Sequence, residues 1–292
     1  MDQAQNLRNI IKANQQRPVA RVITVTSGKG GVGKSNTAIN LAIQFRRMGQ
    51  RVIILDADFG LANIEIMFGA VPKHNLYDLI YKGMSMRDII TWGPEEIGFV
   101  SGGSGIVGMS NLSRDYLTYI IQNLAELDAM ADIIVVDTGA GISDAVLEFL
   151  VASGEIILVT TPEPTSITDV YTLLKALGRH ERFSAETTKI KVLSNRVDTL
   201  EEGKTLFAKL NAVVSRYLKL PIEYLGAVPQ DQELARSVMQ QMPVSINSPK
   251  AISTKAYEEI AAILMNKEIH QTVPKRGMAA FFSHIVAGKK SV

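Results

Sequence analysis

A glycine-rich segment near the N-terminus carries the residues best suited to chemistry in this chain. The run from Gly28 to Ser35 reads GKGGVGKS and satisfies two nucleotide-binding patterns at once. Its glycines fit G-x-G-x-x-G, the dinucleotide fingerprint, and the whole run fits G-x-x-x-x-G-K-[ST], the phosphate-binding P-loop. Asp56, at the end of the next predicted strand, would supply the acid that a dinucleotide fold uses to bind ribose. The glycine spacing therefore leaves both folds open.

Lys34 and Ser35 favour the P-loop. An ATPase loop needs a lysine directly after its last glycine to reach the β- and γ-phosphates, and then a hydroxyl to bind Mg²⁺. A dinucleotide loop needs neither residue. We therefore predict that ATP and Mg²⁺ are the cofactors and that Ser35 binds the metal directly. The phosphates would be enclosed by the backbone of Gly28, Lys29, Gly30, Gly31, Val32, Gly33, Lys34, Ser35 and Asn36.

Acidic residues follow two further apolar runs of the sequence. Asp56 and Asp58 end the run RVIILDAD, and Asp137 ends the run DIIVVDTG. Ligands of open α/β sheets bind at the carboxyl ends of the strands, so these carboxylates would face the phosphate loop. Asp137, after four apolar residues, is placed to hold Mg²⁺ through its water shell. The alternative for Asp137 is a cap at the end of a strand.

Short apolar runs alternate with amphipathic stretches from Arg21 onward, which predicts βαβ units and a mostly parallel sheet with helices on both faces. A polar linker around Pro18 separates this region from a short predicted helix over residues 2–13. We expect an N-terminal helix and linker over residues 1–17, an ATPase domain over residues 18–268 and a C-terminal helical segment over residues 269–292. The predicted strands are RVITVTS, RVIILDAD, IGFVSGG, DIIVVDTG, EIILVTTP, KIKVLSNRV and EYLGAVP.

Composition excludes several classes of function. The 292 residues include no cysteine, which removes disulfides, thiolate nucleophiles and cysteine-held iron–sulfur clusters. A net charge of +2 is far from that of a dedicated nucleic-acid binder, so no nucleic-acid partner is expected. The polar start lacks a secretory signal, and no apolar run is long enough to span a bilayer. We expect a cytoplasmic protein whose membrane contact is peripheral.

The run KGGVGKS resembles the deviant Walker A motif of the MinD/ParA family of ATPases. The resemblance covers about Val19 to Met265 and implies a sheet of seven or eight strands of the SIMIBI type. It also implies that Lys29 reaches across an ATP-held homodimer to the partner's nucleotide, where spacing alone would equally allow a solvated loop lysine. Asn36 stands where many relatives have Thr or Ser. This difference puts in doubt only a role of its side chain, because its backbone can still contact phosphate.

The same resemblance assigns roles to the acids and to the base-binding edge. LDADFGLAN matches the family's first switch segment and DTGAG its second. Asp58 would then orient the attacking water, and Asp56 with Asp137 would hold magnesium through water, so that the catalytic set is Lys29, Lys34 and Asp58. Asparagine can pair with the edge of adenine. The family places near the base Asn195, Arg196, Pro229 and Asp231, although turn chemistry is the alternative for Asn195.

The C-terminal stretch KRGMAAFFSHIVAGKK has the pattern of an interfacial membrane helix. Its apolar residues recur at helical spacing and its flanks are basic. MinD-like proteins end in a similar targeting helix that binds anionic membrane, which implies localisation at the inner face of the cell membrane. The alternative is a helix that docks on its own core. The predicted membrane-facing residues are Met278, Phe281, Phe282, Ile285 and Val286.

The N-terminal DQAQNLR resembles a short motif of the FlhG subfamily of MinD relatives, also called YlxH or FleN. In that subfamily the segment stimulates the SRP-type GTPase FlhF, and the pair controls flagellar placement and number. Flagellar basal-body (C-ring) proteins are further expected partners, and the alternative is a frayed terminal helix. The residues that match the motif, with Gln3 placed to support a partner's active site, are Asp2, Gln3, Ala4, Leu7 and Arg8.

These features rank the competing functions. An FlhG-like spatial regulator accounts for both chain ends, and MinD itself, a division-site regulator, is the alternative. A ParA-type segregation ATPase would need a basic DNA-binding surface and no terminal membrane helix. The lack of cysteine excludes an iron–sulfur scaffold, and Lys34 with Ser35 disfavours a dehydrogenase.

Overall fold

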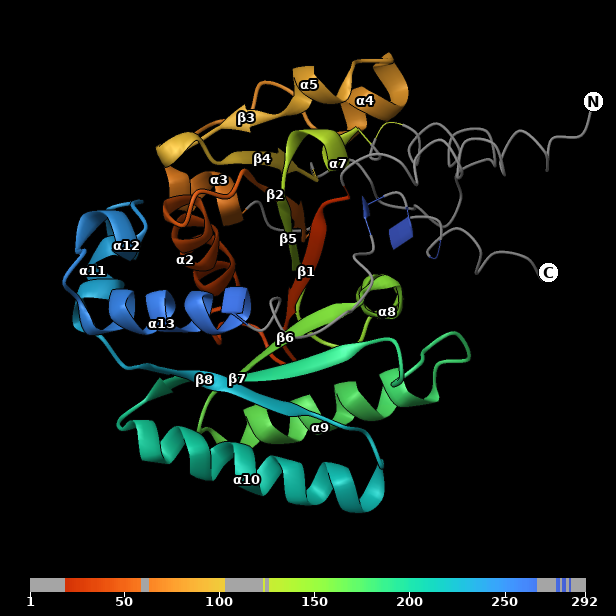
Figure 1. Cartoon of the computed structure of the whole chain (residues 1–292), viewed down its shortest axis with the longest axis vertical. Coiled ribbons are helices and arrows are strands. Elements are labelled where there is room, and N and C mark those ends of the chain that lie inside the picture. The colour runs from red at the N-terminus through yellow and green to blue at the C-terminus, as the bar shows by residue number, and fades with distance from the viewer. Residues whose placement is uncertain are drawn as a thin grey trace, which may run out of the picture.

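The computed structural model describes residues 19–58, 63–102, 123, 126–266, 277–278, 280–281 and 284. It contains one eight-stranded sheet in the order β3-β4-β2-β5-β1-β6-β7-β8 (Figure 1). All neighbouring strands are parallel except β3 and β4. The strands are β1 Arg21–Thr26, β2 Val52–Ala57, β3 Thr91–Trp92, β4 Gly98–Ser101, β5 Ile133–Thr138, β6 Glu155–Thr160, β7 Lys189–Val197 and β8 Glu223–Pro229.

The predicted fold class is confirmed, since the sheet is mostly parallel and has eight strands. All seven predicted apolar runs form strands, but the edge strand β3 was not predicted. It has two residues, which is too short to show a hydrophobic period. It pairs antiparallel with β4 through a tight connection, Gly93 to Ile97, in which Glu95 and Glu96 both adopt positive φ.

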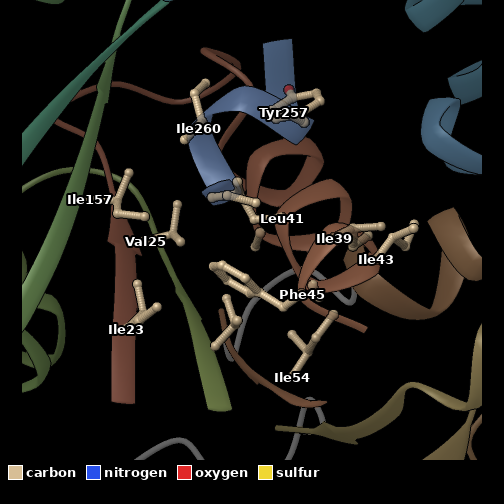
Figure 2. Close-up of a cluster of buried hydrophobic side chains, with 14 of the residues drawn as sticks. Ile23, Val25, Ile39, Leu41, Ile43, Phe45, Ile54, Ile157, Tyr257 and Ile260 are labelled. Carbon is tan, nitrogen blue, oxygen red and sulfur yellow. The ribbon is translucent and has the colours of Figure 1, made fainter. Parts of the chain in front are cut away.

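Alternation along each strand divides the core into two layers. On β1, Ile23 and Val25 face one side, whereas Val22 faces the other. The first side packs under α2 and α13, and Figure 2 shows Phe45 and Leu41 of α2 against these strand residues. The opposite side packs under α4, α5 and α7 at one end of the sheet and α8, α9 and α10 at the other.

The helices of the described residues cover both faces. The long ones are α2 Lys34–Arg47, α9 Pro164–Arg179, α10 Leu200–Tyr217 and α13 Ile252–Asn266. The shorter ones are α3 Asn63–Phe68, α4 Leu76–Lys82, α5 Met86–Ile89, α7 Leu127–Met130, α8 Asp144–Ala152, α11 Gln232–Met239 and α12 Val244–Asn247, with a 3-10 turn at Pro94–Glu96. The predicted helix over residues 2–13 lies outside the described residues. Of the described helices, none combines the length and apolarity needed to cross a bilayer.

Candidate functional site

The parallel register of the central strands assembles the site. Asp56 of β2 lies directly opposite Asp137 of β5, and β5 pairs on its other side with β1, which leads into the glycine-rich loop. Parallel strands end at a common edge, so residues from three distant segments meet there. Gly141 donates its N–H to the Ser27 carbonyl (3.0 Å), which ties the segment after Asp137 to the loop.

Three glycines of the loop have a steric or conformational reason to be glycine. Gly31 and Gly33 have φ of 76° and 97°, and Gly33 is the N-cap of α2. A methyl group on Gly28 would lie 2.3 Å from the backbone of α9 at Asp169. A methyl group on Gly30 would meet nothing within 4 Å, so its space is open toward the site. The loop therefore presents its backbone at the N-terminus of α2, where anions bind favourably.

Asp137 is the most constrained acid of the site. It is fully buried, and neither of its carboxylate oxygens has a hydrogen-bond partner within normal distance among the described residues. Burial raises its pKa to about 6, against the opposing influence of the nearby Ser35 hydroxyl and Lys34 ammonium. A buried carboxylate without partners fits a cation that is brought in from outside. Asp137, Asp56 and Ser35 thus form a donor set of oxygens that suits Mg²⁺.

Asp56 and Asp58 are linked to each other and to α3. One oxygen of Asp56 accepts the N–H of Asp58 (3.1 Å), and the other accepts the N–H of Ile64 (3.4 Å). Burial and then the neighbouring Asp137 raise the pKa of Asp56 to about 7. Asp58 accepts from the Asn63 side chain (3.4 Å) and lies beside Gly139, so it is held near the segment after β5. The acids of both predicted switch segments are therefore neighbours.

Lys29 lies at the exposed side of the loop and has partners that the sequence analysis missed. Its ammonium contacts Glu163 (2.8 Å) and the Thr165 hydroxyl (2.9 Å), both at the start of α9. The Lys29 charge lowers the pKa of Glu163. The only signal for this pair was the position of Glu163 just after strand EIILVTT, which predicts a place at the same sheet edge. About a third of the Lys29 side chain remains accessible, at 37%.

At the base-binding edge, Asn195 is bonded to the loop itself. Its side-chain amide donates to the carbonyl of Val32 (2.7 Å), and it is buried beneath Gly33. One of its two amide hydrogens is thus already used by the protein. Arg196 follows at a β-bulge with φ of 55° and lines a hollow of about 320 Å³ with Gln230.

Asp231 is engaged by protein donors on both oxygens. It caps α11 through the N–H of Glu233 (2.9 Å) and accepts from the backbone and hydroxyl of Ser253 (3.0 and 2.7 Å). Burial raises its pKa, but these hydrogen bonds lower it more, so the net shift is downward. It fixes the loop after Pro229, which ends β8. That role is structural, and contact of Pro229 or Asp231 with the base stays a prediction.

Two of the predicted membrane-facing residues are covered by the protein. Met278 and Phe281 are buried in the core cluster beneath α7 and α8, with the Phe281 ring 5.8 Å from that of Phe149. For these two residues the structure has the docked arrangement that was the alternative. Membrane binding stays a prediction. Outside the described residues are Phe282, Ile285, Val286 and the N-terminal set Asp2, Gln3, Ala4, Leu7 and Arg8.

Fold and site together define a P-loop nucleotide hydrolase. Residues 18–265 match the ParA family model, described as NUBPL iron-transfer P-loop NTPase. Antiactivator FleN of Pseudomonas aeruginosa is 39% identical over 241 residues, covering 82% of this chain and 85% of that protein. Flagellum site-determining protein YlxH of Helicobacter pylori is 30% identical over 290 residues, covering 98% and 96%. The structure resembles Pyrococcus horikoshii MinD complexed with Mg-ADP, with a TM-score of 0.65, 20% identity and coverage of 87% and 98%.

The chain belongs to the ParA/MinD family of P-loop NTPases and is an ATPase. The resemblance to the MinD/ParA family that the sequence indicated is therefore confirmed. The family model is described as an iron-transfer protein, but this chain contains no cysteine that could serve as an iron ligand.

Proposed function

We propose that this ATPase is a molecular switch that controls the number or placement of flagella. The observation that carries the proposal is the similarity to flagellum site-determining protein YlxH, which covers 98% of this chain, together with the similarity to antiactivator FleN. The proposal has three parts: an ATP cycle, a nucleotide-dependent dimer at the membrane, and a partner activated by the N-terminal segment.

In the ATP cycle, the loop backbone and Lys34 hold the phosphates, and Asn195 fixes the loop from behind through Val32. Ser35, Asp56 and Asp137 would hold Mg²⁺, which would neutralise charge on the phosphates. Asp58 would orient the attacking water, because it lies in the first switch segment beside Gly139 of the second. Both Asp56 and Asp137 must lose their protons to bind the cation, so their raised pKa values make cation binding stronger as pH rises through about 6 to 7.

In the dimer, Lys29 leaves Glu163 and reaches the nucleotide of the partner subunit. Its exposure supports this role, because a partly accessible ammonium can exchange a surface carboxylate for a phosphate at little cost. A lysine from across the interface supplies positive charge where phosphoryl transfer develops negative charge. Dimerisation would then be coupled to the presence of ATP.

The C-terminal segment supplies the membrane contact. Because Met278 and Phe281 are buried, this contact requires the segment to leave the core. One short helix binds a membrane weakly, whereas two helices on one dimer gain about 10²-fold or more through effective concentration. The protein would therefore occupy the cytoplasmic face of the membrane mainly in its ATP-bound form.

The N-terminal segment, residues 1–17, is the proposed activator of an FlhF-type GTPase, with Gln3 supporting the partner's active site. Basal-body C-ring proteins are the proposed structural partners at the flagellar site. MinD itself is the second candidate function, because the fold is shared with a MinD structure. That candidate does not account for the DQAQNLR segment.

One experiment separates these functions. The GTPase activity of purified FlhF is measured alone, with a peptide of residues 1–20 and with the same peptide carrying Gln3→Ala. We expect stimulation by the first peptide of about tenfold or more, where a fully supplied catalytic group gives about 10³–10⁵-fold in phosphoryl transfer, and little by the second. Equal rates in all three reactions would contradict the flagellar proposal and favour a MinD-type role.

A further inference from the structure

Gly277 joins the two ends of the described chain at one point. A methyl group on Gly277 would lie 2.4 Å from the Asp128 carboxylate and 2.5 Å from the Val19 side chain. Real side-chain atoms do not approach that closely, so Gly277 leaves no room for a side chain between Asp128 of α7 and Val19, two residues before β1. Val19 is 258 positions away in sequence, yet it packs directly on the C-terminal segment.

The C-terminal segment is held in this seat by polar and apolar contacts. The Met278 N–H donates to Asp128 (2.8 Å), and the Phe281 N–H donates to the Gly277 carbonyl (3.0 Å), which forms a helical turn capped by Asp128. Met278 and Phe281 share one core cluster with Ala20 and Val22 of the chain start.

A second polar contact links the C-terminal segment to α8 through Arg182. The Arg182 side chain donates to the His284 carbonyl and pairs with Glu148 of α8. Phe149, the next residue of α8, stacks on Phe281. The segment that follows Asp137 therefore leads into the helix that holds the C-terminal seat.

We propose that this seat couples the C-terminal segment to the start of the domain, so that release of the C-terminal segment also loosens Val19, the point at which the N-terminal activating segment joins the domain. We define the seat as Val19, Asp128, Phe149, Gly277, Met278 and Phe281. Sheet pairing of β1 starts only at Arg21, whose N–H donates to Asp132. Val19 lies before that bond, so its packing on Gly277, and not sheet pairing, holds it in place.

The coupling has a directional consequence. When the C-terminal segment moves to a membrane, Val19 loses the surface it packs on, and the joint between the N-terminal activating segment and the domain loosens. Partner activation is then strongest for the membrane-bound form. This regulatory role rests on the proposed function, but the coupling itself does not.

The test uses the full-length chain and two variants matched in added bulk. Gly277→Val puts a branched side chain into the filled space and prevents seating without altering the apolar residues of the segment. Ala280→Thr adds similar bulk at an exposed position of the same turn. Hydrogen exchange is followed by mass spectrometry in peptides over residues 16–21 and 277–284, and over β5 as a reference for global unfolding.

We expect Gly277→Val to accelerate exchange about tenfold or more in both terminal peptides and to leave β5 unchanged. Ala280→Thr should match the parent protein. Faster exchange at residues 277–284 with unchanged exchange at residues 16–21 would overturn the coupling. If Gly277→Val does not fold, deletion of residues 275–292 replaces it, because the deletion removes the surface under Val19; exchange is then followed in the peptide over residues 16–21 alone, and an unchanged rate there would overturn the coupling.

A functional measurement separates the coupling from the proposed function. Full-length Gly277→Val should stimulate the GTPase activity of FlhF more than the full-length parent protein does. The peptide of residues 1–20 is the common reference for both proteins and should give the same stimulation in each comparison. If the peptide stimulates but the variant does not exceed the parent, the coupling is wrong and the proposed function stands. If the peptide is inactive while exchange at the two ends still rises together, the coupling stands and the proposed function is wrong.

Discussion

Asp137 lowers the stability of the nucleotide-free protein and provides a carboxylate suited to binding Mg²⁺. Its carboxylate is fully buried without hydrogen-bond partners within normal distance among the described residues, and its pKa is raised to about 6. An acid with a raised pKa binds its proton more tightly in the folded state than in the unfolded state. The protein without nucleotide therefore loses stability as pH rises from about 4 to about 6. Bound Mg²⁺ would remove that cost by supplying the missing partner.

Asp137→Asn is expected to stabilise the nucleotide-free protein and to abolish Mg²⁺-dependent nucleotide binding. At pH 8 the gain in unfolding free energy should approach about 3 kcal/mol at most, and it should disappear as pH falls through about 4 to below about 3, where the carboxyl is protonated in both states. Urea unfolding in EDTA at several pH values measures the gain in unfolding free energy, and calorimetry measures nucleotide binding.

The exposed Asp144→Asn is the control for Asp137→Asn and should change stability by less than about 0.5 kcal/mol. If Asp137→Asn were less stable than the parent at pH 8, another partner would already satisfy this carboxylate.

At the scale of elements, the site depends on strand ends and helix starts that come from four separate segments. β2 and β5 bring Asp56 and Asp137 together by register, and β1 leads into the loop that starts α2. The start of α9 closes the site through Glu163. Each strand run could be predicted from its apolar pattern, whereas the contact between Lys29 and α9 could not, because it joins residues 134 positions apart.

The C-terminal element has two expected roles, and one deletion tests both. Removing residues 275–292 should abolish ATP-dependent co-sedimentation with anionic liposomes. It should also lower the free energy of unfolding by about 3 kcal/mol or more, because it exposes the surface under two buried side chains, Met278 and Phe281. Liposome binding and urea unfolding measure these effects separately.

The parent protein with ADP is the control for liposome binding. An unchanged unfolding midpoint in the deletion variant would contradict the docked arrangement. Persistent binding to liposomes would place the membrane contact elsewhere in the chain.

At the scale of the whole molecule, Lys29 is the residue through which the proposed dimer would connect one chain to a second. In this structure its ammonium is held by Glu163 and Thr165 of the same chain. A dimer in which Lys29 contacts the partner's phosphates must exchange these contacts. In the proposed dimer, Glu163 would therefore compete with dimerisation, and the balance between the two states would depend on whether ATP is present.

Lys29→Ala should leave nucleotide binding measurable by calorimetry and prevent ATP-dependent dimerisation. Loss of a hydrogen bond to a charged group costs about 1.5–3 kcal/mol, and each dimer would lose two such contacts. Sizing with a non-hydrolysable ATP analogue measures the oligomeric state. Glu163→Gln is the matched variant, and it should dimerise at least as well as the parent because it releases Lys29. Normal dimerisation of Lys29→Ala would end the proposal of a lysine acting across the interface.

The sequence by itself determined the nucleotide chemistry and most of the fold. Loop residues Gly28 to Ser35 are contiguous, so their spacing survives any arrangement of the chain, and seven of eight strands carry their own apolar pattern. The tertiary structure decided what depends on distant contacts: the pairing of Lys29 with Glu163, the engagement of Asn195 by the loop, and the burial of Phe281. An amphipathic stripe requires an apolar surface to cover it, but it has the same pattern for a membrane as for the protein's own core. Only packing distinguishes the two, and here it places Gly277 against Val19, the first residue that the structure describes.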